Sequence, residues 1–399
     1  MSRSLRRAAG SLLVVGLGGA ELTGLERAWL RLLRPGGVIL FRRNIVDAEQ
    51  TRALLDEATG LGALHAVRCV DVEGGTVNRL RDALAPMPSA QAVCGADGSG
   101  ASGVSGARKD KISAPSIKVQ KSRSLARMHG ELVARAVKAF GFNTTLAPVV
   151  DLVLPESVEV MGTRAPAADP EQVTAFAQEF LRGLVAQGVA GCGKHFPGLG
   201  GAEGDTHFVM PAIDRTWKQI WDEDLAPYRA LHASMPMIMT NHAAFPETKG
   251  GMAPASASRF WITKVLRRQI GYKGIILSDD LEMGGILKFL PVEEAAVEAV
   301  RVGTDLLEIC HSAELILRSF EALISEAERS AVFRTLLLER ARSCERKRAR
   351  LYAGGVAKAL TPKQLEKLKD EIGRFREQVA AIGSAGEVEA RATSPAERT

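Results

Sequence analysis

The sequence predicts an α/β protein built on a single (β/α)8 TIM-type barrel with a loop insertion and a C-terminal helical extension. Short apolar runs rich in Leu, Val and Ile alternate with longer amphipathic stretches, which is the pattern of parallel strands joined by helices. Eight such runs fall within about 330 residues, enough to close a barrel. An open, doubly wound sheet is the competing architecture.

Each expected strand is a short apolar run. The strands are expected at Leu12–Gly16, Gly37–Phe41, Ala66–Asp71, Thr144–Val150, Val189–His195, Pro236–Asn241, Gly274–Asp279 and Thr304–Ile309. Helices are expected between them, including Glu21–Leu33, Pro170–Gln187, Ala257–Gln269 and Val292–Val302. The barrel is thereby expected to occupy residues 1–350.

Two segments do not follow this alternation. Residues 95–124 are rich in Gly, Ser, Ala and Lys and show no period, which predicts a flexible basic insertion in a barrel loop. Residues 351–399 contain an amphipathic stretch, Pro362–Ala380, followed by a tail of small and charged residues. We expect a C-terminal helix and a disordered tail there.

The charge balance is local. The chain has 52 Lys and Arg against 46 Asp and Glu, a formal net charge of +6. Segments 98–127 and 341–377 each carry +6, so the remainder is mildly acidic. With only 5% aromatic residues and no basic face interleaved with them, nucleic-acid binding is disfavoured. No apolar run is long enough to span a membrane, and a monomer is expected.

The cysteine pattern bears on the cellular compartment. The chain has five cysteines, an odd number without a C-x-x-C pair, which is typical of reduced thiols in a cytoplasmic protein. Arg3, Arg6 and Arg7 precede an apolar stretch ending at Gly19, a pattern also found in short signal peptides. We favour a first buried strand at Leu12–Gly16, because the barrel requires it, and expect a cytoplasmic protein.

Charged or polar side chains follow five of the expected strands, where barrel enzymes carry their chemistry. They are Asp71 with Glu73, Asp151, Lys194 with His195, Asn241 with His242, and Asp279 with Asp280. A single acid after a strand can be a helix N-cap, but five groups at one rim predict a site. Asp279 suits a nucleophile or a metal ligand, and Asp280 is expected to cap the next helix.

A second constellation is Asp205-Thr206-His207, in a loop rich in glycine. An acid two residues before a histidine can accept a hydrogen bond from the imidazole and raise its basicity. A metal site is the alternative for His195, His207 and His242, but their spacing matches no ligand motif such as H-E-x-x-H. We therefore expect neither a metal nor another cofactor.

Several motifs occur together and in a fixed order. They are Lys194-His195-Phe196-Pro197-Gly198, Asp205-Thr206-His207 and Ser278-Asp279-Asp280-Leu281-Glu282-Met283, with Gly37–Phe41, Asp71–Arg79, Leu146–Asp151 and Gly162–Arg164. In these motifs the chain resembles the β-N-acetylglucosaminidases of glycoside hydrolase family 3, over roughly residues 10–330. The resemblance implies a metal-free retaining exo-enzyme acting on terminal β-linked N-acetylglucosamine, with N-acetylglucosamine-containing saccharides or muropeptides from peptidoglycan as partners.

The resemblance also implies residue roles. Asp279 matches the nucleophile, His207 the general acid/base and Asp205 its partner in a dyad. The residues that match the sugar-binding positions are Asp71, Arg79, Arg164, Lys194 and His195. Retaining hydrolysis needs a nucleophilic carboxylate and a second group that first protonates the leaving oxygen and then deprotonates water. An imidazole can supply that second function near neutral pH.

The chain departs from the family pattern at Leu199, where a second histidine is usual, at Thr206, where serine is usual, and at Val72, where glutamine is usual. None of these changes removes a residue of the expected chemistry. Two other functions stay open. One is a phosphorylase, since a histidine would not repel an incoming phosphate, and the other is a catalytically idle sugar-binding barrel. A β-glucosidase is disfavoured, because the roughly 70 residues beyond residue 330, where the resemblance ends, cannot form the usual second domain.

Overall fold

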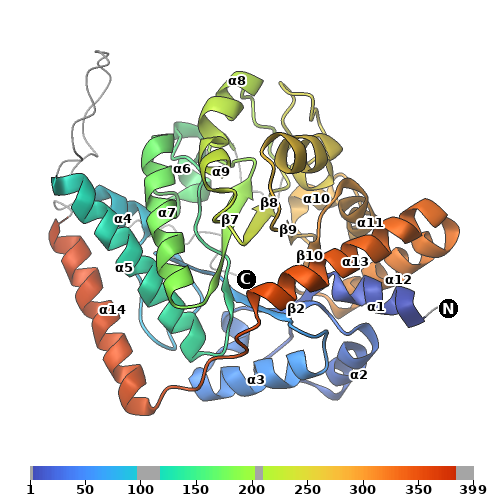
Figure 1. Cartoon of the computed structure of the whole chain (residues 1–399), viewed down its shortest axis with the longest axis horizontal. Coiled ribbons are helices and arrows are strands. Elements are labelled where there is room, and N and C mark those ends of the chain that lie inside the picture. The colour runs from blue at the N-terminus through green and yellow to red at the C-terminus, as the bar shows by residue number, and fades with distance from the viewer. Residues whose placement is uncertain (1–2, 97–116, 203–209, 383–399) are drawn as a thin grey trace.

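The computed structural model describes residues 3–96, 117–202 and 210–382. Eight parallel strands close into a barrel surrounded by helices (Figure 1). The strands are β1 (Leu13–Val15), β2 (Gly37–Leu40), β3 (Val67–Val70), β6 (Thr144–Thr145), β7 (Ala190–Phe196), β8 (Met237–Thr240), β9 (Ile275–Asp280) and β10 (Leu306–Ile309). Their order around the barrel is β1-β10-β9-β8-β7-β6-β3-β2. The predicted (β/α)8 barrel is confirmed, and an open sheet is excluded.

All eight strands lie where the apolar runs predicted them; six are shorter than expected, and the fourth is shortened most. The central residues of these runs are buried; Ile275, Ile276 and Leu277 of β9, for example, are fully inaccessible. The expected strand Thr144–Val150 is regular only over Thr144–Thr145. Pro148 has no backbone N–H to donate to a neighbouring strand, which interrupts the regular ladder.

Helices of varied length cover the outside of the barrel. They are α1 (Arg3–Ser11), α2 (Gly24–Leu33), α3 (Ala48–Gly60), α4 (Ala90–Gly95), α5 (Ile117–Ala139), α6 (Val158–Met161), α7 (Pro170–Ala186), α8 (Trp217–Gln219), α9 (Ala226–Leu231), α10 (Gly284–Leu287), α11 (Val292–Val302), α12 (Ala313–Arg329), α13 (Ala331–Leu351) and α14 (Pro362–Ile382). Short 3-10 turns lie at η1 (Arg42–Asn44), η2 (Pro155–Ser157) and η4 (Ala255–Ala257). Two π-helices, η3 (Ile220–Asp224) and η5 (Phe260–Gln269), complete the set; η5 occupies most of the expected helix Ala257–Gln269.

A short hairpin that the periodicity did not predict follows β3. It consists of β4 (Val72–Gly74) and β5 (Val77–Asn78), which pair antiparallel. Its turn contains Gly74 and Gly75, whose φ angles of +100° and +62° lie in a region that side chains rarely adopt. The hairpin carries Glu73 over the barrel and leads the chain to Arg79.

The expected basic insertion coincides only in part with irregular structure. Residues 97–116 of that range lie outside the described residues, whereas α5 begins at Ile117. The last eight residues of the predicted insertion are therefore helical. After Pro115 the sequence contains neither Gly nor Pro until Gly130, so nothing prevents a helix from starting there.

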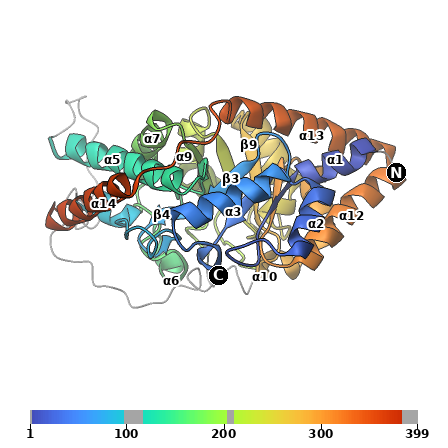
Figure 2. The same cartoon turned by 90° about the horizontal axis from the view of Figure 1, so that it is seen from below.

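The C-terminal helix α14 lies against α5 (Figures 1 and 2). Its apolar face is buried, including Phe375, and Glu371 forms an ion pair with Arg135 of α5. The expected helix Pro362–Ala380 thus lies within an observed helix two residues longer, whereas the expected tail beyond it lies outside the described residues. On another side of the molecule α13 runs along α1 (Figures 1 and 2).

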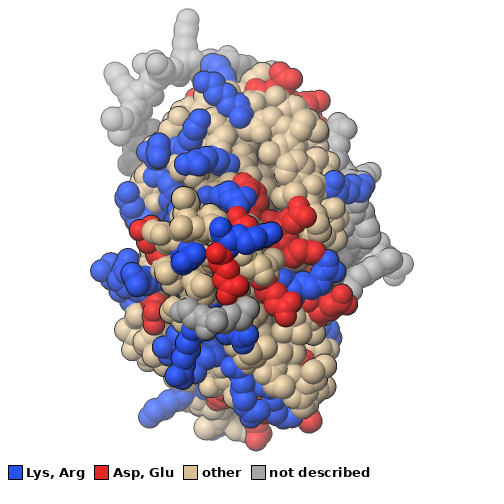
Figure 3. Space-filling model, turned by 90° about the vertical axis from the view of Figure 1, so that its right-hand side faces the viewer, with Lys and Arg blue, Asp and Glu red and all other residues tan. Residues whose placement is uncertain are grey.

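Within the described ranges, no helix combines the length and apolarity that crossing a membrane requires. The face shown in Figure 3 carries both signs of charge, with Lys and Arg interspersed among acidic side chains that gather near its middle. That face therefore presents no continuous basic surface of the kind that binds nucleic acid.

Candidate active site

The carboxyl ends of the strands bring the predicted polar residues together at one end of the barrel. Asp71 directly follows β3, Lys194 and His195 lie near the end of β7, and Asp279 lies near the end of β9. Since all eight strands are parallel, these ends share one rim. The rim predicted from the sequence is thus a real cluster.

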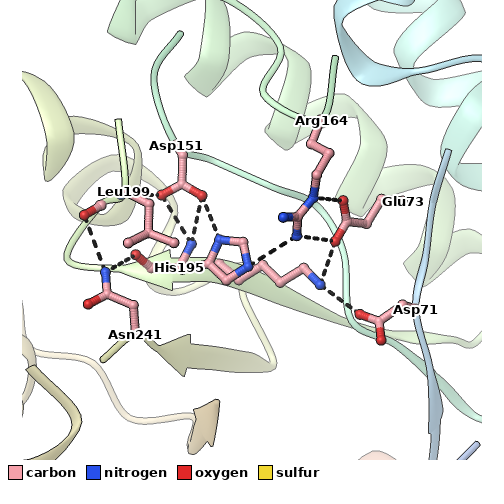
Figure 4. Close-up of polar contacts among 9 residues, drawn as sticks. Asp71, Glu73, Asp151, Arg164, His195, Leu199 and Asn241 are labelled. Carbon is pink, nitrogen blue, oxygen red and sulfur yellow. Dashed lines mark hydrogen bonds and ion pairs between the residues drawn. The ribbon is translucent and has the colours of Figure 1, made fainter. Parts of the chain in front are cut away.

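A network of two cations and two carboxylates lies at the centre of this rim (Figure 4). Lys194 Nζ lies 2.7 Å from Asp71 Oδ1 and 2.6 Å from Glu73 Oε1. Arg164 donates two hydrogen bonds to Glu73, from Nε at 2.8 Å and from Nη2 at 2.9 Å. This bidentate pair fixes the orientation of both side chains.

The charges in this network stabilise one another in a buried place. Burial raises the pKa of Glu73, but Arg164 and Lys194 lower it more, so that the carboxyl is ionised. Burial lowers the pKa of Lys194, but Asp71 and Glu73 raise it by more. The net shift is upward, so the ammonium keeps its charge. The network therefore offers fixed charged donors and acceptors to a polar ligand at neutral pH.

His195 is held by Asp151, the residue predicted at the end of the fourth strand. The imidazole Nδ1 lies 2.7 Å from Asp151 Oδ2, which also accepts the backbone N–H of His195 at 3.1 Å. With its Nδ1 proton donated to Asp151, the ring has Nε2 free to accept from Arg164 Nη2 at 3.3 Å. Asp151 thus orients His195 toward the Arg164 network (Figure 4).

The departure at Leu199 leaves this arrangement intact. Its backbone N–H donates to Asp151 Oδ1 at 2.8 Å, a contact that does not depend on the side chain. Asn241, at the end of β8, donates to the carbonyl oxygens of His195 at 3.0 Å and Gly198 at 3.2 Å (Figure 4). Asn241 therefore positions the backbone and is not a ligand-facing group.

Asp279 is ionised and is oriented by its own backbone. The N–H of Asp280 donates to Asp279 Oδ1 at 2.9 Å. Burial raises the pKa of Asp279, but the Lys194 ammonium and the Asp280 N–H lower it, and the net shift is downward. A rigidly held, deprotonated carboxylate is what a nucleophile at this position requires.

Asp280 and His242 serve the local structure. Asp280 was expected to cap the next helix; instead its Oδ1 accepts the N–H of Glu282 at 3.1 Å and closes a turn before α10. His242 uses both ring nitrogens, with Ser256 Oγ at 2.7 Å and the Asp280 carbonyl oxygen at 3.0 Å. Burial lowers the pKa of His242, so the ring is neutral and supports the chain around Asp280.

Arg79 lies at the edge of the same rim, just after β5. Its backbone N–H donates to the Asp71 carbonyl oxygen at 3.0 Å, and its guanidinium lies 5.7 Å from the ring centre of Phe41. All five predicted sugar-binding residues are thus brought to one end of the barrel. Asp205 and His207 lie outside the described residues.

The sequence reasoning missed one acid at this end of the barrel. Glu308 of β10 is only 2% exposed, and its carboxyl lies 4.0 Å from Cys69 Sγ. The signal was present, since a glutamate within the apolar run Leu306–Ile309 is unusual for a buried strand. Among the described residues, no three His, Cys, Asp or Glu side chains are grouped to hold a metal ion.

Comparisons with known proteins agree with this site. Residues 5–336 match the family described as Glycosyl hydrolase family 3 N terminal domain. A Beta-hexosaminidase from Chromobacterium violaceum is 37% identical over 302 residues, which cover 75% of this chain and 79% of the relative.

Two solved structures share the fold at similar identity. A family 3 β-N-acetylglucosaminidase from Paenibacillus sp. str. FPU-7 aligns with a TM-score of 0.78 at 27% identity, covering 94% of this chain and 69% of the other. NagZ from Neisseria gonorrhoeae, in complex with N-trifluoroacetyl-D-glucosamine, aligns with a TM-score of 0.70 at 26% identity, covering 94% and 98%. The chain belongs to glycosyl hydrolase family 3 and, within it, to the β-hexosaminidases, which are glycoside hydrolases.

Proposed function

We propose that this protein is a retaining exo-β-N-acetylglucosaminidase that forms a glycosyl-enzyme on Asp279. The observation that carries the proposal is the ionised Asp279 carboxylate, held by the Asp280 N–H at the rim that also contains the Lys194 network. Such a carboxylate can attack the anomeric carbon while the bond to the leaving oxygen breaks. The sugar is then released when water breaks the new ester bond.

The sugar is bound by Asp71, Arg79, Arg164, Lys194 and His195 in this proposal. Lys194 and Arg164 offer charged N–H donors, and Asp71 offers a carboxylate acceptor, within a cluster where every group already has a fixed position. A site built from paired polar groups rejects analogues that leave those groups unpaired. We therefore propose that N-acetyl-β-glucosaminides are strongly preferred over β-glucosides.

The general acid/base is His207, oriented by Asp205, a role that the sequence motif supports. The described residues at the rim offer few substitutes. Glu73 is held deprotonated between Arg164 and Lys194, and His242 has both ring nitrogens engaged. His207 would give its proton to the leaving oxygen and recover one from the attacking water.

We also propose a natural substrate and a compartment. The resemblance of the motifs supports muropeptides, with terminal N-acetylglucosamine on peptidoglycan fragments, as the natural substrate. Four of the five cysteines, Cys69, Cys192, Cys310 and Cys344, are buried free thiols, which supports a reducing cytoplasmic environment.

The test is release of a chromophore from an aryl N-acetyl-β-glucosaminide, with and without phosphate, with the sugar product followed by NMR. We expect free N-acetylglucosamine that appears first as the β-anomer, and much slower release from the aryl β-glucoside. N-acetylglucosamine 1-phosphate as the main product would instead identify a phosphorylase. Absence of release from the folded protein would identify an idle sugar-binding barrel.

A further inference from the structure

Glu308 lies inside the barrel, on the strand next to the proposed nucleophile. Residue Glu308 of β10 is in register with Asp280 of β9. Its carboxyl contacts Cys69 of β3, and β1 and β2 separate β3 from β10 in the barrel. Only side chains that point into the barrel can meet across that separation, so both Glu308 and Cys69 point inward.

The backbone of Glu308 is linked to the irregularity that carries Asp279. The register between β9 and β10 shifts here: Leu306 pairs with Leu277 and Glu308 with Asp280, so a step of two residues along β10 matches a step of three along β9. The N–H of Glu308 donates to Ser278 Oγ at 3.0 Å, and the Glu308 carbonyl oxygen accepts the N–H of Leu281 at 3.0 Å. A bulge of this kind re-aims a side chain next to an active site, here that of Asp279.

Acids outnumber cations around the Glu308 carboxyl. Asp71, just after β3, and Asp279 and Asp280 of β9 raise the pKa of this carboxyl, while Lys194 of β7 lowers it. The buried thiols of Cys69, Cys192 and Cys310 also interact with it. The Lys194 ammonium is already within 2.7 Å of two carboxylates, Asp71 and Glu73.

A further carboxylate at this position would be an uncompensated buried charge. Burial and the three neighbouring acids raise the pKa of Glu308 well above its ordinary value, and Lys194 offsets only part of this rise. The geometry and the charges agree that the acid keeps its proton at neutral pH.

We propose that Glu308 is a positioning residue: as a neutral acid it leaves Lys194 on Asp71 and Glu73, and its ionisation draws Lys194 away from the sugar-binding site. This proposal rests on the proposed function, because the Lys194 network matters for catalysis only if it binds the sugar. The step itself is loss of one proton to solvent. Its kinetic consequence is a rise in KM at alkaline pH, separate from the fall in kcat that deprotonation of His207 would cause.

The activity test compares KM between pH 6 and 10 for the wild type, Glu308→Gln and Glu294→Gln. Glu294 is an exposed acid of α11 and is the matched control. We expect KM of the wild type and of Glu294→Gln to rise by up to about tenfold per pH unit once Glu308 ionises, since binding then requires a minor protonation state. In Glu308→Gln, which cannot ionise, KM should change less than about twofold over the same range. An alkaline rise in KM that is the same in all three proteins would overturn the proposal.

A stability measurement tests the proton independently of the reaction. The unfolded chain releases the Glu308 proton near the ordinary glutamate pKa, whereas the native protein retains it to higher pH. The wild type should therefore lose stability relative to Glu308→Gln as the pH rises above that ordinary value. The ratio of their unfolding equilibrium constants, wild type over Glu308→Gln, should rise by up to about tenfold per pH unit. A ratio that is constant with pH would show that Glu308 is ionised in the native state and would overturn the proposal.

The two measurements separate failure of this proposal from failure of the proposed function. If the protein cleaves no N-acetylglucosaminide, the stability ratio still reports the proton on Glu308. If Glu308→Gln does not fold, infrared spectra of the wild type and of Glu308→Met provide the same test. Asp224, whose pKa burial raises to about 7, contributes a protonated-carboxyl C=O band to both proteins. We expect a further band of this kind at neutral pH that is present in the wild type and lost in Glu308→Met, and identical spectra of the two proteins would contradict the account.

Discussion

The two ends of the barrel both bury charged side chains, but the partners of those charges differ. At the amino end, the Asp305 carboxylate accepts hydrogen bonds from Arg267 at 2.5 Å, from Lys347 at 2.8 Å and from the backbone N–H of Ile276 at 2.9 Å. Lys347 also donates to the Gly274 carbonyl oxygen at 2.9 Å. These contacts connect α13 and η5 to the amino-terminal ends of β9 and β10.

Arg348 completes this end and donates to backbone groups, whereas the charges around Asp305 combine ion pairs with backbone contacts. Its Nη1 donates to the carbonyl oxygens of Ser11 at 3.1 Å and Gly36 at 2.7 Å, and the side chain is 1% exposed. It thus joins the C-terminal end of α13 to the chain segments that lead into β1 and β2. Charges that end on backbone groups stabilise the closure of the barrel.

At the carboxyl end, the four charges of the Lys194 network contact other side chains and, among the described residues, no backbone group. Lys194, Arg164, Asp71 and Glu73 contact side chains across the rim, and Asp279 is held by a single local N–H. Buried charge by itself therefore does not locate a functional site. The two ends differ in whether the paired charges also hold backbone groups, as around Asp305, or contact side chains alone, as around Lys194.

The largest effect that this comparison predicts is at Asp279. Asp279→Asn removes the nucleophile and keeps the size of the side chain, so kcat should fall on the order of 10⁴-fold for an aryl N-acetyl-β-glucosaminide, with thermal stability retained. Asp280→Asn is the matched control, and its kcat should stay within about tenfold of the wild type, because its contacts support only a turn and His311. The reverse order of the two variants would assign the reaction to Asp280.

A matched pair of lysines tests the difference between the ends directly. Lys194→Met leaves Asp71 without its cation and Glu73 with Arg164 alone, and should lower kcat/KM by about 2–5 kcal/mol in transition-state binding. Lys347→Met removes an ammonium that also has two acceptors, but at the other end. Steady-state kinetics should show no change in kcat/KM for Lys347→Met, and chemical unfolding should show its loss of stability. Equal effects of both variants on kcat/KM would break the comparison.

At the amino end, loss of Arg348 should act on stability alone. Arg348→Met leaves two buried carbonyl oxygens without their charged donor, and we expect a loss of about 3 kcal/mol in the free energy of unfolding. Urea denaturation measures this loss, with kcat recorded on the same samples. Arg301→Met, which removes an exposed arginine paired with Glu298 and Glu326, should cost less than about 1 kcal/mol. A large kcat defect in Arg348→Met would show that the amino end affects the site.

The smallest expected effect comes from a buried group that belongs to neither end. His129 of α5 packs against Phe180 and Phe375, and burial lowers its pKa to about 3. The unfolded chain takes up a proton near pH 6.5 that the native state excludes, so stability falls as the pH drops below that value. His129→Leu should remove this dependence, a difference of up to about 1.4 kcal/mol per pH unit between pH 6.5 and 5. Parallel stability curves for the two proteins would show that the native state accepts the proton.

The sequence predicted the elements well because their signals are local. Buried runs such as Gly274–Asp279 and Pro236–Asn241 show both the strand and the polar residue after it, so the rim followed once the barrel was assumed. The helix that begins at Ile117 was missed, because composition was given more weight than the absence of helix-breaking residues after Pro115.

The contacts within the site could not be predicted in the same way. Lys194 meets Asp71 across 123 residues of sequence, through a closure that no local period reports. The hairpin that brings Glu73 to Arg164 is only five residues long in its paired part, too short for a periodic signal. Glu308 was missed although it is an acid in an apolar run, and its role depends on strands that lie next to it only in the closed barrel.

The most direct test of the central claim is to identify the residue that carries the sugar during turnover. The enzyme is mixed with an activated aryl N-acetyl-β-glucosaminide, quenched rapidly in acid and digested for peptide mass spectrometry, with Asp279→Asn as the control. The account predicts an N-acetylglucosaminyl adduct on the Asp279 side chain in the wild type and its absence from the variant. An adduct on another residue, or α-anomeric sugar as the first product, would contradict the assignment of Asp279 as the nucleophile of a retaining enzyme.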